Sequence, residues 1–274
     1  MPVIVSWPRQ TVTDISRTNR LRAMSETTQT YRGGDIELCR NKPKGQPFLK
    51  PLYGFPPYQY TGDVVLMIVY EADEAAIREV LPRELEPLPG NVVAMCFFLC
   101  PDVTGIGPHT FTMPCIPVRY GDYQGQFVPY LFTSTDASLA AYREGQGWPA
   151  VFGDTGIKDH GEGKFTARVV RNGREVIRAS ATVGGEKITT LDFLPIILYK
   201  EIPNSDGTDC DVAYFMTSTS KLTNLDFKAG TGELSFTDTD DPISRLKPLK
   251  VTSALYGTLD DYYPESCRVL KNLK

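Results

Sequence analysis

The sequence has 274 residues, of which 41% are hydrophobic and 23% are charged, a composition typical of a globular protein. Its formal net charge of −4 provides no broad basic surface for a phosphate backbone, so we expect no nucleic-acid partner. The sequence contains no run of 18 apolar residues and no apolar signal-peptide segment near its start. These features predict a cytoplasmic protein that does not associate with a membrane.

Six cysteines are spread through the chain, at positions 39, 96, 100, 115, 210 and 267. They form no CxxC pair, so the sequence predicts neither a zinc site nor a disulfide framework, and we expect reduced, mostly buried thiols. The sequence also lacks a phosphate-binding loop, a dinucleotide fingerprint and a His/Asp/Glu cluster with metal-ligand spacing. We therefore expect no organic cofactor and no metal.

The first 54 residues form an N-terminal extension in this interpretation, with one predicted helix around "TDISRTNRLRAM" (13–24). We expect the extension to pack on the core or on a neighbouring subunit. Residues 55–274 form the core domain. It opens with a buried-strand pattern in "VVLMIVY" (64–70), and a short helix over 73–82 follows, closed by Pro82.

The rest of the core domain is mainly strand-like, with turn residues between apolar runs. Asn172-Gly173 separates two alternating runs in "TARVVRNGREVIRAS", a strong signal for a two-residue hairpin. The segment 138–151 carries a second predicted helix, which ends near Gly145 to Pro149. A hairpin turn is predicted at "GTGEL" (230–234), and a turn or bulge at "VGGEK" (183–187). The pattern favours a mainly β, α+β fold, whose antiparallel sheet is closed as a barrel or folded as a sandwich, with a few peripheral helices.

Several segments together, in this order, resemble the acetoacetate decarboxylase family: "IVYEADEAAIREVLPRELEP", "GIGPHTFTMPCIPVRYGDYQG", "AAYREGQGWP", "RASATVGG", "LPIILYKEIPNSDG" and "LTNLDFKAGTGELSF". The resemblance covers roughly residues 55–272. It implies a closed antiparallel β-barrel with helices outside, a cavity for a small molecule, and a homo-oligomer. The family's reaction is decarboxylation of a β-keto acid through a Schiff base with a lysine whose pKa a neighbouring cation depresses.

The resemblance also implies that this chain lacks the family's reactive amines. The tandem lysines of the family follow an aromatic residue and a proline, and the same frame here reads Trp148-Pro149-Ala150-Val151. The sequence has no lysine between positions 51 and 157, so a shift in the alignment does not restore one.

The other polar residues of the family's pocket are replaced as well. The family's pocket arginine corresponds to a position near Asp63, and its two glutamates correspond to positions near Met95 and Phe111. Together with Phe132 and Trp148 as expected cavity lining, and with Ala150 and Val151, these residues are the predicted substrate-binding set. They indicate a pocket that is lined for a different, more apolar ligand.

Three residues are candidates for the remaining catalytic chemistry: His109, Arg119 and Tyr130. His109 lies two residues before Phe111, so both side chains face the same side if the segment is a strand, whereas in a rim loop His109 has no role. Arg119 offers a bidentate donor set, or is a surface arginine near a turn. Asp136 and Tyr142 are weaker candidates for proton transfer.

Two further polar features are interpreted as structural. His160 lies in the polar turn "KDHGEGK" and is expected to be solvated. Arg143-Glu144 is expected to form an ion pair or to support the loop that lost its lysines.

The leading functional hypothesis is an enzyme of specialised metabolism that uses the barrel without covalent catalysis. It would be a lyase, isomerase or cyclase for a small, largely apolar keto, polyketide-like or terpenoid-like compound. One alternative is a decarboxylase whose amine has moved to Lys158, Lys187 or Lys221, with Lys187 the best of the three. The other is a non-catalytic binding protein, which we would favour if the candidate polar groups point away from the cavity.

Overall fold

The computed structural model describes residues 46–47, 50–191 and 193–274. The chain divides into two units, Met1–Pro51 and Leu52–Lys274. The helix expected at 13–24 lies outside the described residues. Among the residues that are described, no helix is long and apolar enough to cross a membrane.

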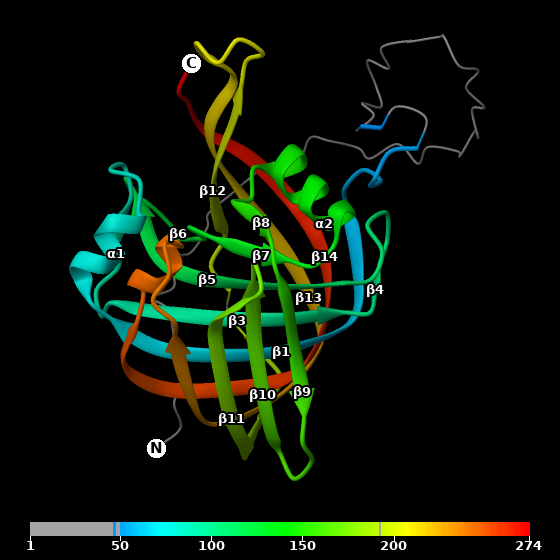
Figure 1. Cartoon of the computed structure of the whole chain (residues 1–274), viewed down its shortest axis with the longest axis vertical. Coiled ribbons are helices and arrows are strands. Elements are labelled where there is room, and N and C mark those ends of the chain that lie inside the picture. The colour runs from blue at the N-terminus through cyan, green and yellow to red at the C-terminus, as the bar shows by residue number, and fades with distance from the viewer. Residues whose placement is uncertain (1–45, 48–49, 192) are drawn as a thin grey trace. The chain divides into compact units, whose positions relative to one another are not determined.

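Strands dominate the described chain (Figure 1). They are β1 (Tyr58–Ala72), β2 (Glu86–Pro87), β3 (Val92–Cys100), β4 (Asp102–Val103), β5 (His109–Tyr120), β6 (Tyr123–Phe127), β7 (Leu131–Thr133), β8 (Ala150–Phe152), β9 (Asp154–Asp159), β10 (Lys164–Arg171), β11 (Arg174–Ile188), β12 (Ile196–Pro203), β13 (Cys210–Phe236) and β14 (Pro248–Asn272). The helical segments are α1 (Glu74–Val80), α2 (Asp136–Ala140), the π-helix η1 (Ala141–Gln146) and the 3₁₀-helix η2 (Pro242–Arg245). The two predicted helices are thus present, and the second is a short α-helix that continues as a π-helix.

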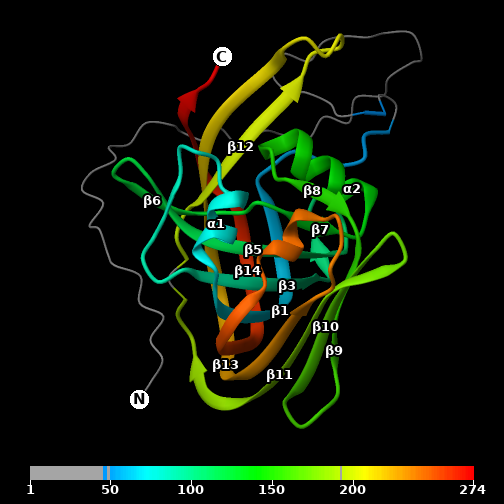
Figure 2. The same cartoon turned by 60° about the vertical axis from the view of Figure 1, so that its left-hand side comes forward.

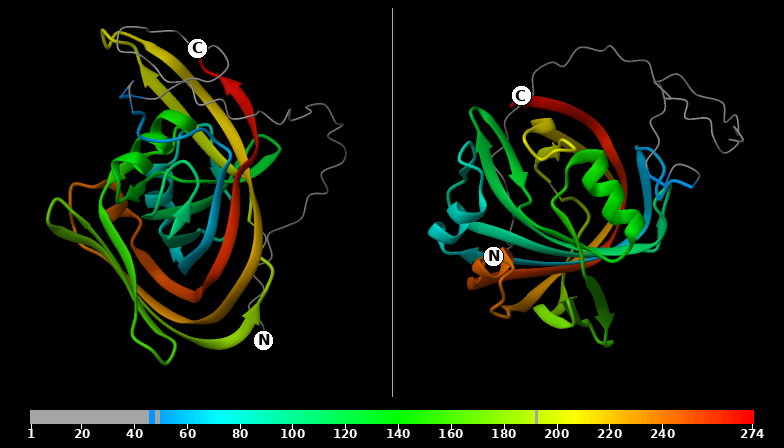
Figure 3. Two further views of the ribbon diagram at one scale, coloured as in Figure 1. Left: turned by 90° about the vertical axis from the view of Figure 1, so that its right-hand side faces the viewer. Right: turned by 45° about the horizontal axis from the view of Figure 1, so that its top comes forward.

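Seven strands close into a ring, in the order β12-β6-β5-β3-β1-β14-β13 and back to β12. Neighbours in the ring are antiparallel except β6 and β12, which pair in parallel at Ile196↔Gln126 and Ile197↔Phe127. Figure 3 shows β1, β13 and β14 curving together around one side. The predicted closed, mainly antiparallel barrel is therefore confirmed, and its closure leaves no edge strand in the ring.

Strands β11, β10 and β9 extend the sheet from the second half of β13, below the ring in the view of Figure 2. The predicted hairpin at Asn172-Gly173 joins β10 to β11, with φ of 50° and 75° as a type I′ turn requires. The glycine pair in "VGGEK" forms a bulge, since the β11–β13 register shifts between Val183 and Lys187.

The prediction of a hairpin turn at "GTGEL" (230–234) is wrong. This segment continues β13 without a turn, paired with β11 and partly with β14. A Cβ on Gly230 would lie 2.0 Å from the Thr182 carbonyl oxygen, so glycine here permits close strand packing.

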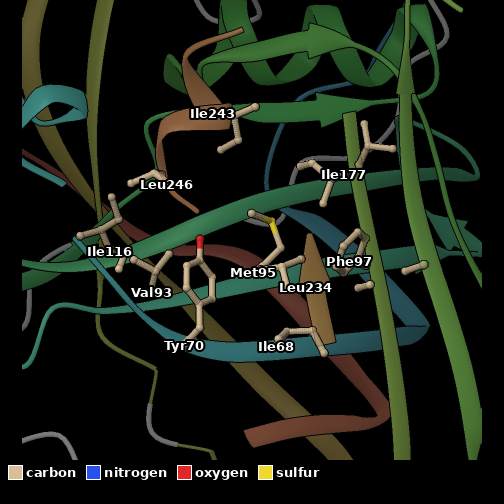
Figure 4. Packing of buried hydrophobic residues seen from close by; sticks show 14 of the residues in the cluster. Ile68, Tyr70, Val93, Met95, Phe97, Ile116, Ile177, Leu234, Ile243 and Leu246 are labelled. Atoms are coloured by element: carbon tan, nitrogen blue, oxygen red, sulfur yellow. The ribbon is translucent and has the colours of Figure 1, made fainter. Parts of the chain in front are cut away.

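The ring strands bury side chains on both faces, in two clusters. On β3, Val93, Met95 and Phe97 belong to one cluster, and Cys96, Phe98 and Cys100 belong to the other, as strand alternation requires. We name the second the cavity-side cluster, because its residues surround the cavity on the inner face of the ring. Figure 4 shows the opposite cluster, to which β10, β11 and η2 also contribute.

One polar atom in the opposite cluster yields a stability prediction. Tyr70 is fully buried and its hydroxyl has no hydrogen-bond partner, although burying an unpaired hydroxyl is costly. We expect Tyr70→Phe to leave the free energy of unfolding unchanged or to raise it by up to about 2 kcal/mol, measured by urea denaturation.

Tyr58→Phe is the matched control, because the Tyr58 hydroxyl donates to the Gly54 carbonyl at 3.0 Å. Its loss should cost about 1 kcal/mol. Equal destabilisation by both changes would show that the Tyr70 hydroxyl is satisfied in solution.

Candidate functional site

A cavity of about 300 Å³ lies on the inner face of the ring, a size at the lower end of small-molecule sites. Every ring strand contributes to its wall: Tyr60 and Asp63 from β1, Phe98 from β3, Phe111 from β5, Gln126 from β6, Ile196 from β12, Thr219 from β13, and Asp261 and Tyr263 from β14. Tyr142 of η1 and Trp148, just beyond it, also line the cavity.

A bulge in β1 brings Asp63 into the cavity. The pairing of β1 with β14 shifts register between Tyr60 and Asp63, and Gly62 in the bulge has a φ of 69°. Tyr60 and Asp63 are three residues apart and would face opposite sides of a regular strand. Because the bulge adds a residue, both side chains point into the cavity.

Two carboxyl groups line this part of the cavity, that of the buried Asp63 and that of the half-buried Asp261. Asp63 is 2% exposed, and burial raises its pKa to about 7, with a smaller opposing effect from a hydrogen bond with the Cys100 thiol. Burial likewise raises the pKa of Asp261 to about 7, although the Ser220 hydroxyl donates to it at 3.0 Å. One oxygen of each carboxyl, Oδ1, has no partner.

A chain of hydrogen bonds reaches the cavity from His109. The His109 Nδ1 contacts the Gly107 carbonyl oxygen at 2.9 Å, and its Nε2 contacts the Tyr142 hydroxyl at 2.7 Å. The Tyr142 hydroxyl is in turn 3.3 Å from the Tyr60 hydroxyl. All three side chains are at most 5% exposed. Burial lowers the pKa of His109 from 6.5 and raises the pKa of both tyrosines well above 10.0.

The rest of the wall is largely aromatic. Phe98 and Phe111 stack with ring centroids 4.3 Å apart, and the ring centroids of Trp148 and Tyr263 are 5.8 Å apart. The Tyr263 hydroxyl contacts the Ser218 hydroxyl at 2.7 Å. The cavity therefore combines an apolar body with two separate polar features.

The structure brings part of the predicted site together. Asp63, Phe111 and Trp148 line the cavity, and His109 contacts it through Tyr142. Ala150 is buried in the cavity-side cluster, whereas Val151, the next residue on β8, packs against the opposite cluster. Two adjacent strand residues face opposite sides, so only the first of the two faces the cavity side.

Met95 and Phe132 lie elsewhere than predicted. Both are fully buried in the opposite cluster, where Figure 4 labels Met95. Their strand neighbours Cys96 and Leu131 face the cavity side instead. A one-residue offset on a strand changes the face, and a resemblance without long motifs does not set that offset.

Arg119 and Tyr130 also lie outside the cavity. Arg119 is half-exposed and donates to Glu86 at 2.5 Å, which raises the arginine's pKa and lowers that of the glutamate. The Tyr130 hydroxyl donates to Asp241 at 2.5 Å, and Arg171 pairs with the same carboxylate at 3.2 Å. Each residue is held by a structural partner.

The three lysines considered for a relocated amine, Lys158, Lys187 and Lys221, are all exposed. Lys187 forms an ion pair with Asp226 at 3.2 Å. None of them lines the cavity.

Sequence reasoning missed Lys200, which is buried on β12 and 8% exposed. Its Nζ donates to the carbonyl oxygens of Glu144 and Gly145 at 2.6 Å each, and burial lowers its pKa. Gly147, with a φ of 75°, packs so closely that a Cβ would lie 2.5 Å from the Lys200 Cβ. Lys200 therefore fixes the end of η1, the segment that carries Tyr142.

Other structural interpretations are consistent with the geometry. His160 is exposed and contacts the Thr166 hydroxyl at 2.8 Å. Arg143 donates to the Ala150 carbonyl at 3.1 Å, and Glu144 accepts from Tyr53 at 2.6 Å, so both support this segment without pairing with each other. Of the described cysteines, Cys96, Cys100 and Cys115 are buried, Cys210 is half-buried and Cys267 is exposed. The described residues contain no group of three His, Cys, Asp or Glu side chains placed to hold a metal.

Tyr60, Asp261 and Tyr263 were not selected from the sequence either. The signal lies in the alternation of "TLDDYY", which puts Leu259, Asp261 and Tyr263 on one face of β14. A carboxylate on a buried strand face is unusual enough to single out.

A closed ring of strands with a cavity on its inner face defines a β-barrel protein whose cavity has the size of a small-molecule site. A family model described as acetoacetate decarboxylase (ADC) matches residues 46–266. The chain therefore belongs to the acetoacetate decarboxylase family, as its sequence resemblance implied.

Individual relatives support this membership. The acetoacetate decarboxylase of Acidiphilium cryptum is 31% identical over 184 residues, covering 64% of this chain and 72% of the relative. Acetoacetate decarboxylase 2 of Mesorhizobium japonicum is 26% identical over 246 residues, covering 80% and 90%.

Solved structures share the fold. Acetoacetate decarboxylase from Legionella pneumophila superposes with a TM-score of 0.73 at 24% identity, covering 82% of this chain and 91% of that one. The enduracididine biosynthesis enzyme MppR, with HEPES bound, superposes with a TM-score of 0.69 at 18% identity, covering 82% and 91%.

The raised pKa of Asp63 predicts a pH-dependent effect on stability. The folded protein holds this proton up to about pH 7, whereas the unfolded chain loses it near 3.8. The free energy of unfolding therefore falls as pH rises through this window. Asp63→Asn should stabilise the protein by about 2 to 4 kcal/mol more at about pH 8 than at about pH 4.

The measurement is thermal unfolding at both pH values, with Asp102→Asn as the control because Asp102 is an exposed carboxylate on β4. A Tm difference between Asp63→Asn and the unsubstituted chain that stays constant with pH would contradict the raised pKa.

The contacts of Lys200 predict a structural effect rather than a chemical one. Lys200→Met removes the ammonium donor from the part-buried carbonyl oxygens of Glu144 and Gly145 and should destabilise the protein by about 1.5 to 3 kcal/mol in urea denaturation. A lysine whose Nζ is held by two carbonyls should also form no borohydride-trapped adduct with acetoacetate. Mass detection of an adduct that disappears in Lys200→Met would show that the amine is reactive.

Proposed function

We propose that this chain is a cofactor-independent enzyme that moves protons on a small, largely apolar keto compound held in the ring cavity. Its reaction class is that of a lyase, isomerase or cyclase, without a Schiff base. The observation that carries the proposal is the hydrogen-bond chain from His109 through Tyr142 to Tyr60, which ends at the cavity wall.

The Gly107 carbonyl at one end of the hydrogen-bond chain sets the direction of every hydrogen bond in it. The Gly107 carbonyl only accepts, so the proton of neutral His109 is on Nδ1, and Nε2 accepts from the Tyr142 hydroxyl. Tyr142 has a single proton, so Tyr60 must be the donor between the two tyrosines. The Tyr60 oxygen is then left as an acceptor toward the cavity.

This arrangement can act as a base and then as an acid. Tyr60 takes a proton from the carbon beside a keto group as its own proton moves to Tyr142 and that of Tyr142 moves to His109 Nε2. The electron pair of the broken C–H bond enters the enolate. The reverse transfer returns the proton to the product, so no oxidant or reductant is consumed.

The pKa shifts favour the protonation states from which proton transfer along the hydrogen-bond chain begins. Burial lowers the pKa of His109, so the imidazole is neutral and can accept a proton at neutral pH. The raised pKa values of Tyr60 and Tyr142 keep both hydroxyls protonated until transfer begins. The Nδ1–H bond to Gly107 stabilises the imidazolium that forms.

Non-covalent chemistry is supported by the lining of the cavity. Ala150 and Val151 replace the tandem lysines, and the lining residues of the described chain include no lysine or arginine. Lys200 is occupied by two carbonyls outside the cavity. These features weigh against a decarboxylase with a relocated amine.

We also infer a role in specialised metabolism, because this fold is shared with an enzyme of enduracididine biosynthesis. We expect a cytoplasmic homo-oligomer that needs no cofactor, binds neither nucleic acid nor membranes, and packs residues 1–54 on the core or on a neighbouring subunit.

Proton exchange provides the test. The protein is incubated in deuterium oxide with a neutral ketone such as 2-tetralone, and with acetoacetate, with and without borohydride. We expect deuterium to enter beside the keto group without a protein adduct, and Tyr142→Phe or His109→Gln to slow this exchange roughly 10²-fold or more. The exchange rate should also fall as pH drops through the lowered pKa of His109, because imidazolium cannot accept the proton.

Tyr130→Phe and His160→Gln are matched controls, since both side chains lie outside the cavity. Deuterium exchange that persists in Tyr142→Phe would show that the hydrogen-bond chain from His109 to Tyr60 does not transfer the proton. A borohydride adduct would favour the decarboxylase, and binding without any exchange would favour the non-catalytic binding protein.

A further inference from the structure

The charge of the cavity is opposite to what a keto acid requires. Asp63, Asp261 and Glu265 line it, and among the described lining residues no lysine or arginine balances them. A carboxylate ligand would enter against these like charges without a cation to pair with. The lining therefore disfavours anionic ligands.

The carboxyls of Asp63 and Asp261 both belong to the cavity wall, and each keeps one buried oxygen without a donor. Asp63 and Asp261 lie on the paired strands β1 and β14, two residues apart in register, and both side chains line the cavity. Asp63 is 2% exposed, yet its Oδ1, like that of Asp261, accepts no hydrogen bond. Buried acceptors without donors are rare in proteins, so a donor group on a ligand is the natural complement.

The surrounding rings suit a cation. Tyr60, Trp148 and Tyr263 line the same cavity as the carboxyls, and Trp148 and Tyr263 are 5.8 Å apart between centroids. Aromatic faces attract cations, especially ammonium groups taken out of water. A hydroxyl supplies one donor and no charge, whereas an ammonium group supplies up to three donors and the charge that two carboxylates lack.

A metal ion fits less well than an organic cation. Calcium and magnesium take six or more oxygen ligands, and no group of three potential ligand side chains of this kind is found in the described chain.

We propose that Asp63 and Asp261 bind a protonated amine, or another cationic nitrogen, of a ligand whose remainder is apolar. The substrate class is then an amine-bearing keto compound, an assignment that rests on the proposed function, whereas the binding preference itself does not require turnover. The amine lies between the two carboxylates, and the apolar part extends along Phe98 and Phe111.

The same geometry makes binding dependent on pH. Burial raises the pKa of both carboxyls to about 7, so they ionise near neutral pH and amine affinity should increase as pH rises through this region. The other titratable groups around them are Tyr60, Cys100, Tyr142, Asp260, Tyr263 and Glu265. The tyrosines and Cys100 have raised pKa values and stay neutral in this window, so they do not contribute to the change.

Calorimetric titration of the full chain with three probes of one shape, benzylamine, benzyl alcohol and benzoate, tests the proposal. We expect benzylamine to bind at least about tenfold more tightly than benzyl alcohol at about pH 8, and benzoate to bind most weakly. The preference for benzylamine should shrink by about pH 5.5, when the carboxyls are protonated.

Asp63→Asn and Asp261→Asn should each weaken benzylamine binding about tenfold and leave benzyl alcohol binding nearly unchanged, while Asp102→Asn should alter neither. Equal binding of benzylamine and benzyl alcohol, or tighter binding of benzoate, would overturn the proposal. If a variant does not fold, the pH dependence of the unsubstituted protein decides, since pH-independent amine binding would also overturn it.

The two proposals fail separately. Tight benzylamine binding without deuterium exchange on any ketone would remove the proposed function and keep this site. Exchange on 2-tetralone without a preference for benzylamine would do the reverse.

Discussion

The closure of the ring by β13 is the constraint on which the rest of the structure depends. This single strand of 27 residues pairs with β12 along its first part, with β14 along much of its length, and with β11 along its last part. Because one strand reaches three neighbours, the sheet closes around a cavity and still extends into β11, β10 and β9 on the other face. The cavity wall is then assembled from residues more than 200 positions apart, such as Tyr60 and Asp261.

The acidic groups in the cavity wall would not support the Schiff-base chemistry of the family's lysines. A Schiff-base lysine needs a neighbouring cation to depress its pKa, whereas the positions that the sequence resemblance assigns to the amines hold Ala150 and Val151, and carboxyls line the cavity. Two aspartates whose pKa values burial raises to about 7 would raise the pKa of an amine beside them and make it less nucleophilic. The loss of lysine and the gain of carboxyls therefore act in the same direction.

The helical segment at the rim links the two polar features of the site. η1 carries Tyr142, which joins His109 to Tyr60, and Trp148 comes directly after it. The last carbonyl oxygens of a helical segment have no intrahelical partner, and the Lys200 ammonium satisfies those of Glu144 and Gly145 at the end of η1. The positions that the resemblance assigns to the family's amines begin β8, just after this segment, and a lysine from β12 supports the segment through its carbonyl oxygens.

The sequence by itself determined the strand-rich fold, the Asn172-Gly173 hairpin, both helices and the family, because these depend on local patterns and on motifs that follow one another along the chain. That Ala150 and Val151 replace the family's lysines stays a prediction from the resemblance. The sequence also indicated Phe111 and Trp148 through the family resemblance, and His109 through its spacing of two residues from Phe111 on one strand. It did not determine which face of β3 carries Met95, nor that Arg119 and Tyr130 have structural partners in Glu86 and Asp241. Only the tertiary structure decided those contacts, since a one-residue register difference or a bulge reverses the direction of a strand side chain. The bulge at Gly62 and the pairing of β1 with β14 bring Asp63 and Asp261 together, and a long-range pairing of this kind leaves no local signal in the sequence.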